Sequence, residues 1–268
     1  MTFRIAVISP IRGAGATTLS VLLNQYIASQ GHSSLLMYTA KDSPVPLMLN
    51  LGVENDPTRS VTQITKLLQQ GSLRDKDILS YTDQYAPNAY VLNSVDKALD
   101  SIELTHIIET LLVREPTRYV TIDVSEDANT KLFEDIVDKS DIVFMVTDPS
   151  RRGFEKFKIW MQTPSIRTNA SKVFAVVNKF DPIIANVRAM ASKLQLPTSY
   201  VCTLHNNAWL PHCSWAQQMN TVIPQVLAYD PRVAELNNDL SEMFGACGMQ
   251  VLAKQMKTVK NALPMKEE

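Results

Sequence analysis

Short apolar runs recur along this chain, and longer segments with helical spacing separate most of them. Most of the runs are apolar on both faces, as in strands of a parallel sheet that helices cover on both sides. This alternation predicts an α/β fold, with a doubly wound, mostly parallel sheet flanked by helices. The predicted strands are Phe3–Ser9, Ser34–Tyr38, Ala89–Asn93, Tyr119–Asp123, Asp141–Val146, Val173–Val177 and Ser199–Thr203.

The segments between these runs have the apolar spacing of amphipathic helices. Similar patterns occupy residues 60–71, with Ser60 as the N-cap, residues 102–115 and residues 130–140. No linker rich in proline, glycine or serine interrupts the alternation. We therefore predict one α/β domain over residues 1–230 and a helical tail over residues 231–268. The first helix has the i, i+3, i+4, i+7, i+8 pattern and a stop at Gly31, with Leu19, Leu22, Leu23, Tyr26 and Ile27 on its apolar face.

Composition narrows the class of protein. The formal net charge of -1 gives the chain no overall field that would attract nucleic acid or an anionic membrane. The three cysteines are widely spaced and odd in number, which predicts neither a disulfide framework nor a metal site and fits a reducing compartment. The start of the chain lacks the pattern of a secretion signal, and no run is long enough to span a bilayer. We therefore expect a cytoplasmic protein.

The stretch from Ile8 to Thr18, ISPIRGAGATT, has the outline of a phosphate-binding loop. A strand precedes it, Gly13 and Gly15 permit a tight turn, and a helix follows with its positive dipole end toward the loop. Thr17 stands where a hydroxyl would hold magnesium, and Thr18 comes next. In the pattern G-x-x-x-x-G-K-[ST], only Gly15 and Thr17 match.

The lysine of that pattern is replaced by Ala16. Such a lysine contacts the β and γ phosphates, and the loss of one charge-assisted contact costs about 1.5–3 kcal/mol of binding free energy. Arg12 has two interpretations: it reaches the phosphates in place of the lysine, or it is a solvated loop residue.

These pieces resemble the MinD/ParA family of P-loop ATPases. The family sequence KGGVGKTT aligns with IRGAGATT at Ile11–Thr18, which places Ile11 at the signature lysine and Ala16 at the P-loop lysine. Tyr38 and Ala40 stand at the positions of the switch-region aspartates. The resemblance implies a P-loop NTPase-like fold of the MinD/ParA type.

Two later strand ends extend the resemblance. YVTIDVS places Asp123 at the Walker B aspartate, which together with Thr17 implies a magnesium site; alternatively, Asp123 is a strand-end carboxylate that caps a turn. VFAVVNKFDP implies that Asn178 contacts an adenine base and that Lys179 flanks it. The implied cofactor is ATP or ADP with Mg²⁺. Because both lysines are missing, the absence of any bound cofactor is an equal alternative.

The middle of the chain, residues 60–125, resembles the CpaE/TadZ branch, which localises pilus assembly. The resemblance implies a positioning or assembly adaptor for a pilus, secretion or similar complex, recruited to it through protein partners, with little or no ATP hydrolysis and no catalytic residue. The family's dimer uses the signature lysine, a contact that Ile11 cannot make, so a homodimer that forms without nucleotide is left as an open alternative. The alternative is an active, atypical ATPase for DNA partition or complex positioning that binds non-specific DNA or a membrane.

Three further features each have two interpretations. Arg151, Arg152, Lys156 and Lys158, interleaved with Phe154, Phe157 and Trp160, form either a DNA-binding cluster or, as we favour, a solvated face behind a packed aromatic face. The tail stripe of Leu252, Met256, Val259 and Leu263 docks on protein, as we favour, or lies on a membrane. The segment that contains Cys202, His205, His212 and Cys213 favours loop packing over a metal site.

Overall fold

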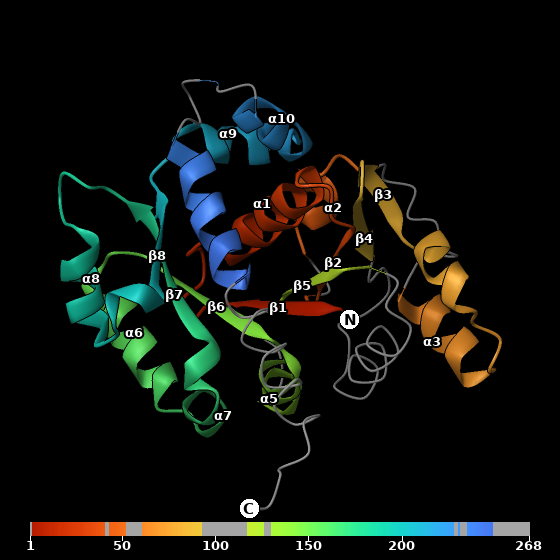
Figure 1. Cartoon of the computed structure of the whole chain (residues 1–268), viewed down its shortest axis with the longest axis horizontal. Helices are drawn as coiled ribbons and strands as arrows, with labels where there is room; N and C mark the ends of the chain where they lie inside the picture. Colours follow the sequence, from red (N-terminus) through yellow and green to blue (C-terminus); the bar gives the residue numbers. More distant parts are fainter. Residues whose placement is uncertain are drawn as a thin grey trace, which may run out of the picture.

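The fold is an eight-stranded sheet with helices on both faces, as the computed structural model shows (Figure 1). The structure describes residues 2–40, 43–51, 61–92, 117–125, 130–227, 230 and 235–248. The strand order is β3-β4-β2-β5-β1-β6-β7-β8, and every neighbouring pair is parallel except β3 with β4. This confirms the predicted fold class. The strands are β1 (Phe3–Ile8), β2 (Ser34–Tyr38), β3 (Asp83–Ala86), β4 (Ala89–Leu92), β5 (Tyr119–Asp123), β6 (Ile142–Thr147), β7 (Val173–Phe180) and β8 (Val201–His205).

All seven predicted strands are present, although some of their ends differ from the prediction by one to three residues. β6 and β8 begin one and two residues later than predicted, and β7 continues three residues beyond Val177. The sequence pattern does not predict β3, a four-residue, partly exposed strand at the sheet edge. A tight turn joins it to β4, and Asn88 in that turn has a φ of 61°.

The helices that fill the connections include those predicted near residues 61–69 and 130–139. A further helical stretch covers residues 235–248. The predicted helix over residues 102–115, the Ser60 cap and the tail stripe lie outside the described residues, and the boundary at residue 230 stays a prediction. The helices are α1 (Ala16–Ser29), α2 (Val45–Met48), α3 (Val61–Gln69), α5 (Thr130–Lys139), α6 (Arg151–Met161), α7 (Pro164–Thr168), α8 (Val187–Leu194), α9 (Trp209–Trp215) and α10 (Val222–Leu227), with 3-10 turns at Asp75–Tyr81, Ala170–Lys172, Thr198–Tyr200 and Met219–Thr221.

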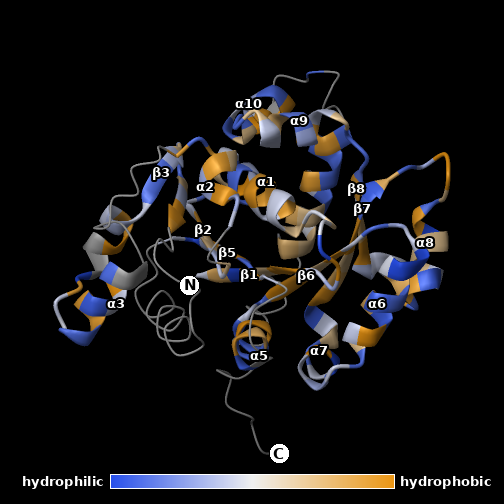
Figure 2. Cartoon of the chain, turned by 180° about the vertical axis from the view of Figure 1, so that it is seen from behind, coloured by the Kyte–Doolittle hydropathy of each residue, from blue (hydrophilic) through white to orange (hydrophobic). Residues whose placement is uncertain are grey.

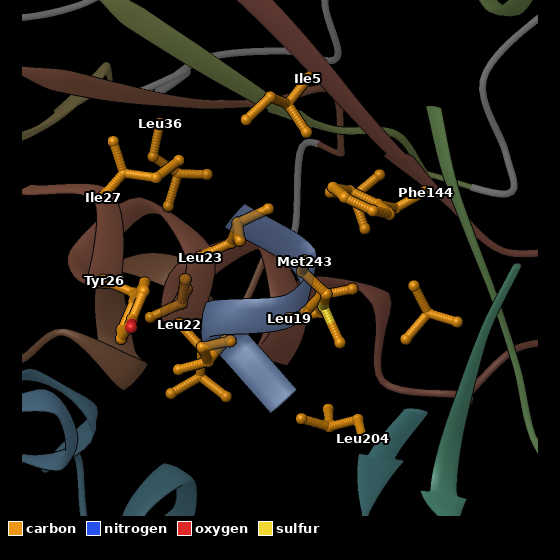
Figure 3. Close-up of a cluster of buried hydrophobic side chains, with 14 of the residues drawn as sticks. Ile5, Leu19, Leu22, Leu23, Tyr26, Ile27, Leu36, Phe144, Leu204 and Met243 are labelled. Atoms are coloured by element: carbon orange, nitrogen blue, oxygen red, sulfur yellow. The ribbon is translucent and has the colours of Figure 1, made fainter. Parts of the chain in front are cut away.

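Each face of the sheet has its own hydrophobic core. On one face, α1 packs beneath α9, α10 and the helical residues 235–248, and on the other lie α3, α5, α6, α7 and α8 (Figures 1 and 2). The predicted apolar face of α1 lies in the first core, where Leu36 of β2, Phe144 of β6 and Met243 meet it (Figure 3). Burial of each large apolar side chain contributes about 1.5–3 kcal/mol, so this packing holds α1 in a fixed position against β1.

Buried polar contacts fix two outlying parts of the chain to this core. Asn24 of α1 donates to Ser34 Oγ at 2.8 Å and accepts from the hydroxyl of Tyr85 in β3. Both oxygens of Asp239 accept from His205, one from the backbone N–H and one from Nδ1, each at 2.8 Å. The helical residues 235–248 are therefore bound to the end of β8. None of the helices that the structure describes has the length and apolar character that crossing a bilayer requires.

Candidate functional site

The loop between β1 and α1 lies at the carboxyl edge of the sheet, at a topological switch point. β1 pairs with β5 on one side and with β6 on the other, so the chain winds in opposite directions from this strand. In open α/β sheets, ligands bind outside the carboxyl ends of the strands at such a point. The predicted phosphate loop therefore occupies the position that the topology favours for a ligand.

Two glycines and a serine shape the loop. Gly13 and Gly15 have φ values of 77° and 95°, in the region that residues with a Cβ rarely adopt. Ser9 Oγ accepts from Ile11 N at 3.1 Å and lies 2.8 Å from Ile11 O and 3.0 Å from Val146 O, so it links the loop to β6. The turn closes with Ala14 N donating to Ile11 O at 3.3 Å.

Helix α1 begins directly behind Gly15, and no side chain caps its N-terminus. The first N–H groups of a helix have no partner within the helix, and the helix dipole makes that end attractive to anions. In α1 these groups belong to Ala16, Thr17 and Thr18, which face the loop. The arrangement can bind an anion such as a phosphate group.

Asn178, at the end of β7, packs against this loop. Its side-chain Nδ2 donates to Ala14 O at 2.6 Å, and a Cβ on Gly15 would overlap the same nitrogen. Its Oδ1 accepts from the backbone N–H of Lys179 at 2.8 Å, and the φ of Lys179 is 57°. The side-chain amide of Asn178 thus supports the loop, while Lys179 is exposed at the rim. The predicted adenine contact stays a prediction.

Asp123, at the end of β5, faces the first turns of α1. Its side chain is buried, and Ser20 Oγ donates to Oδ1 at 3.2 Å. Burial raises the pKa of Asp123 to about 6, while hydrogen bonds from the Thr17 and Ser20 hydroxyls act in the opposite direction. Mg²⁺ prefers oxygen ligands and is commonly bound by one or two carboxylates with several waters. The structure therefore brings the predicted pair, Thr17 and Asp123, together, and both supply oxygen atoms of the kind that this ion prefers; the magnesium site stays a prediction.

Ser20 and Thr39 belong to the same site, although the sequence motifs do not predict either residue. Ser20 follows Thr17 by three residues and so lies on the same face of α1. Thr39 N donates to Asp123 O at 3.0 Å, and Ser125 N donates to Thr39 Oγ1 at 2.8 Å. The spacing in α1 is a signal that could have identified Ser20, whereas Thr39 is placed only by the β2–β5 pairing.

The two positions that resemble lysine sites carry apolar side chains that pack inward. Ile11 and Ala16 are partly buried and pack against the hydrophobic core beneath α1. Arg12 is exposed on the loop, next to Gly13, whose surroundings leave space for a Cβ. Tyr38, at a position that resembles a switch aspartate, is buried in the same core. The described loop thus carries one cation, Arg12, and has apolar side chains at both positions that resemble lysine sites.

The remaining candidates lie outside this site. In α6, Phe154 and Phe157 are buried, Trp160 contacts Phe133 edge-on at 5.1 Å between ring centroids, and Arg151 pairs with Glu155 at 2.8 Å. Cys202 and Cys213 are buried, and His205 pairs with Asp239. Within the described ranges, no three His, Cys, Asp or Glu side chains are grouped so as to hold a metal ion.

The chain has the fold of the MinD and ParA ATPases. No family model and no curated protein matches its sequence. The MinD cell division protein of Aquifex aeolicus superposes with a TM-score of 0.67 at 14% identity, over 91% of this chain and 98% of that one. A MinD complexed with Mg-ADP from Pyrococcus horikoshii gives 0.66 at 17%, over 93% and 99%. A ParA family ATPase from Chlorobium tepidum gives 0.64 at 11%, over 83% and 93%.

Proposed function

We propose that this chain binds a nucleotide, ATP or ADP with Mg²⁺, at the loop before α1, and that it hydrolyses ATP very slowly or not at all. It acts as a positioning or assembly adaptor through protein partners. The observation that carries this proposal is a loop with two positive-φ glycines and an uncapped helix N-terminus, next to the Thr17–Asp123 pair, with apolar side chains at both lysine positions.

The loop shape supports nucleotide binding. Gly13 and Gly15 have positive φ, α1 begins with no side-chain cap, and Asn178 holds the carbonyl of Ala14. The first backbone N–H groups of α1 have no partner within the helix and lie at this loop, so they are available to an anion without the lysine. A phosphate group there would accept from the first turn of α1.

The oxygen pair supports magnesium binding. Thr17 and Asp123 would hold the ion, and Mg²⁺ would supply charge neutralisation to the phosphates when bound. Deprotonated Asp123 is costly in its buried position, as its raised pKa shows. A cation beside it would remove that cost, so ion binding and the burial of this carboxylate support each other.

The apolar residues support slow chemistry. Phosphoryl transfer depends mainly on positioning and on stabilising charge around the transferred group. Ile11 and Ala16 pack against the core beneath α1, and neither carries a charge that could reach the phosphates. A site that keeps backbone N–H groups but loses both lysines retains ground-state binding better than transition-state stabilisation.

The likeness to positioning proteins supports the adaptor role. The solved structures with this fold include a MinD cell division protein and a ParA family ATPase. A pilus or secretion complex is the cargo class that we propose, based on residues 60–125, and a homodimer is the form that we propose. Without a lysine at position 11, such a dimer would form independently of nucleotide.

A second candidate function is an active, atypical ATPase, and the exposed position of Arg12 favours it. Arg12 lies on the loop between Ile11 and Gly13 and could turn its guanidinium toward a bound phosphate. In that case Arg12→Ala would weaken nucleotide binding about tenfold or more, the loss expected for one charge-assisted contact. Under the adaptor proposal, Arg12→Ala leaves the affinity nearly unchanged.

A calorimetric titration with ATP and ADP, in the presence and absence of Mg²⁺, tests the proposal. We expect binding that Mg²⁺ strengthens, and we expect Thr17→Ala to remove that strengthening. Ser29→Ala is the matched control, since Ser29 is an exposed hydroxyl residue at the opposite end of α1, away from Asp123. Absence of binding for the natural chain, or equal loss in both variants, would overturn the proposed site.

A further inference from the structure

The connection between β7 and α8 presents two adjacent isoleucines to solvent. Ile183 is 93% exposed and Ile184 is 81% exposed. Other large apolar side chains among the described residues are also exposed, but no other two are neighbours in sequence. Figure 2 shows this connection projecting from the edge of the molecule beyond β7 and α8, with hydrophobic colouring at its outer part. Contact of these two side chains with another apolar phase would be favourable, because it would remove their apolar surface from water.

The local backbone holds the two isoleucines outward. Asp181 Oδ1 accepts from Ile183 N at 2.9 Å, and Asp181 O accepts from Ile184 N at 3.1 Å and from Ala185 N at 3.2 Å. Asn186 then caps α8 by accepting from Ala189 N at 2.8 Å. Ala185 packs against the second hydrophobic core. The turn is therefore closed by hydrogen bonds and anchored on both sides, and this holds the two isoleucines at its tip in the exposed position.

The segment of the chain around this tip is rich in cations. From the start of α6 to the end of α8, residues 151–194 contain nine Lys and Arg and two Asp and Glu, a net charge of +7, so the rest of a chain with net charge -1 carries -8. Lys179 and Arg188 flank the tip in sequence, and Arg152 lies in the first turn of α6; all three are exposed. α6 packs against α8, where Lys193 lies over the ring of Phe154. α6 and α8 are thus neighbouring helices that carry exposed cations, and Lys179 and Arg188 each lie within four residues of the tip in sequence.

We infer that the Ile183–Ile184 tip and the cations of α6 and α8 bind the surface of an anionic lipid bilayer. The isoleucines enter the boundary between headgroups and acyl chains, and the arginines and lysines meet the lipid phosphates. Nucleic acid is disfavoured because its binding depends on phosphate contacts, and the two isoleucines would stay in water. A bilayer accommodates a convex apolar tip without a matching pocket. The apolar and charged signals together give binding that neither would give alone.

Vesicle sedimentation of the full chain tests this inference. We expect binding to vesicles of phosphatidylcholine mixed with phosphatidylglycerol and little binding to phosphatidylcholine alone. Ile183→Ser with Ile184→Ser should lower the partition coefficient about tenfold or more, because it removes two apolar side chains from the contact. Leu47→Ser is the matched control, since Leu47 is 55% exposed on α2, on the other face of the sheet, and should have no effect. Equal binding by the tip variant and the natural chain would overturn the inference.

A fluorescent probe separates the tip from every other segment that could contact lipid. The three natural cysteines are buried, so a nitrobenzoxadiazole label reacts with the introduced thiol of Ile184→Cys. We expect its emission to rise and shift to the blue on anionic vesicles, whereas the label on Leu47→Cys stays unchanged. Sedimentation without a change at position 184, or a shift of duplex DNA by a chain that does not sediment, would contradict the inference. Nucleotide titration of the tip variant should match the natural chain, so this test is independent of the proposed function.

Discussion

The side-chain nitrogen of Asn178 occupies the space that a Cβ on Gly15 would need. The same nitrogen donates to Ala14 O at 2.6 Å, so the end of β7 and the start of α1 depend on each other. Gly15 is required by its φ of 95° and also by this contact. The shape of the loop is therefore set jointly by two segments that lie far apart in the sequence.

Gly15→Ala should destabilise the protein more than Gly13→Ala does. Both residues have positive φ, which costs an alanine about 1–2 kcal/mol, but only position 15 also brings the new methyl group into Asn178. Urea unfolding of the two variants measures the difference. In the double variant Gly15→Ala/Asn178→Ala, part of the loss should be recovered, because the overlap is gone. Strictly additive losses would contradict the contact.

Asp123→Asn should stabilise the protein at neutral pH when no Mg²⁺ or nucleotide is present. Burial raises the pKa of Asp123 from 3.8 to about 6, so the folded state binds a proton more tightly than the unfolded state does. The free energy of unfolding therefore falls as pH rises from about 4 to about 6, by up to about 3 kcal/mol. The amide that replaces the carboxyl group does not titrate, so the variant should lose this part of the pH dependence.

Asp141 is a matched carboxylate for which the same substitution should change the free energy of unfolding in the opposite direction. Asp141 accepts from Arg4 N at 2.9 Å and pairs with Arg4 Nε at 3.5 Å, so Asp141→Asn should lower the free energy of unfolding. Denaturant unfolding across the acidic range compares both variants with the natural chain. Loss of stability in Asp123→Asn at pH 7 would show that the carboxylate is a structural group instead of a strained functional one.

Asp239→Ala should release the helical residues 235–248 from the sheet. The two oxygens of Asp239 accept both hydrogen bonds from His205, and their removal leaves a part-buried N–H without its partner, at a cost of about 1–3 kcal/mol. Amide hydrogen exchange should speed up across residues 235–248. Glu235→Gln, at an exposed position of the same helix, should leave the exchange unchanged. Equal protection in both variants would show that apolar packing alone holds this helix.

The strands were predictable because strands buried on both faces are apolar throughout, as Val143–Val146 and Val173–Val177 are. β3 was missed because its four residues, Asp83–Ala86, are partly exposed and mostly polar, and it is stabilised by the turn and by Tyr85 binding Asn24. The last residues of β7 were missed because Asn178 and Lys179 are polar, although they continue the strand to Phe180.

The candidate site divides in the same way. The glycines and Thr17 can be predicted from local spacing, because a turn and the start of a helix depend on residues that are close together in the sequence. The Asn178–Ala14 contact joins residues 164 positions apart, and no local pattern predicts it. The same holds for Thr39, whose N–H meets the carbonyl of Asp123 only because β2 and β5 are paired.

The comparison of steady-state ATP turnover between the natural chain and Ala16→Lys tests the central claim most directly. A calorimetric ATP titration of each chain serves as the control that both bind nucleotide. If the loop keeps a nucleotide cradle and has lost its chemistry with the lysine, the natural chain binds ATP with turnover near the uncatalysed rate. The variant, with a charge restored beside the first turn of α1, should then turn over faster by about tenfold or more. Turnover by the natural chain that Ala16→Lys leaves unchanged would contradict the account.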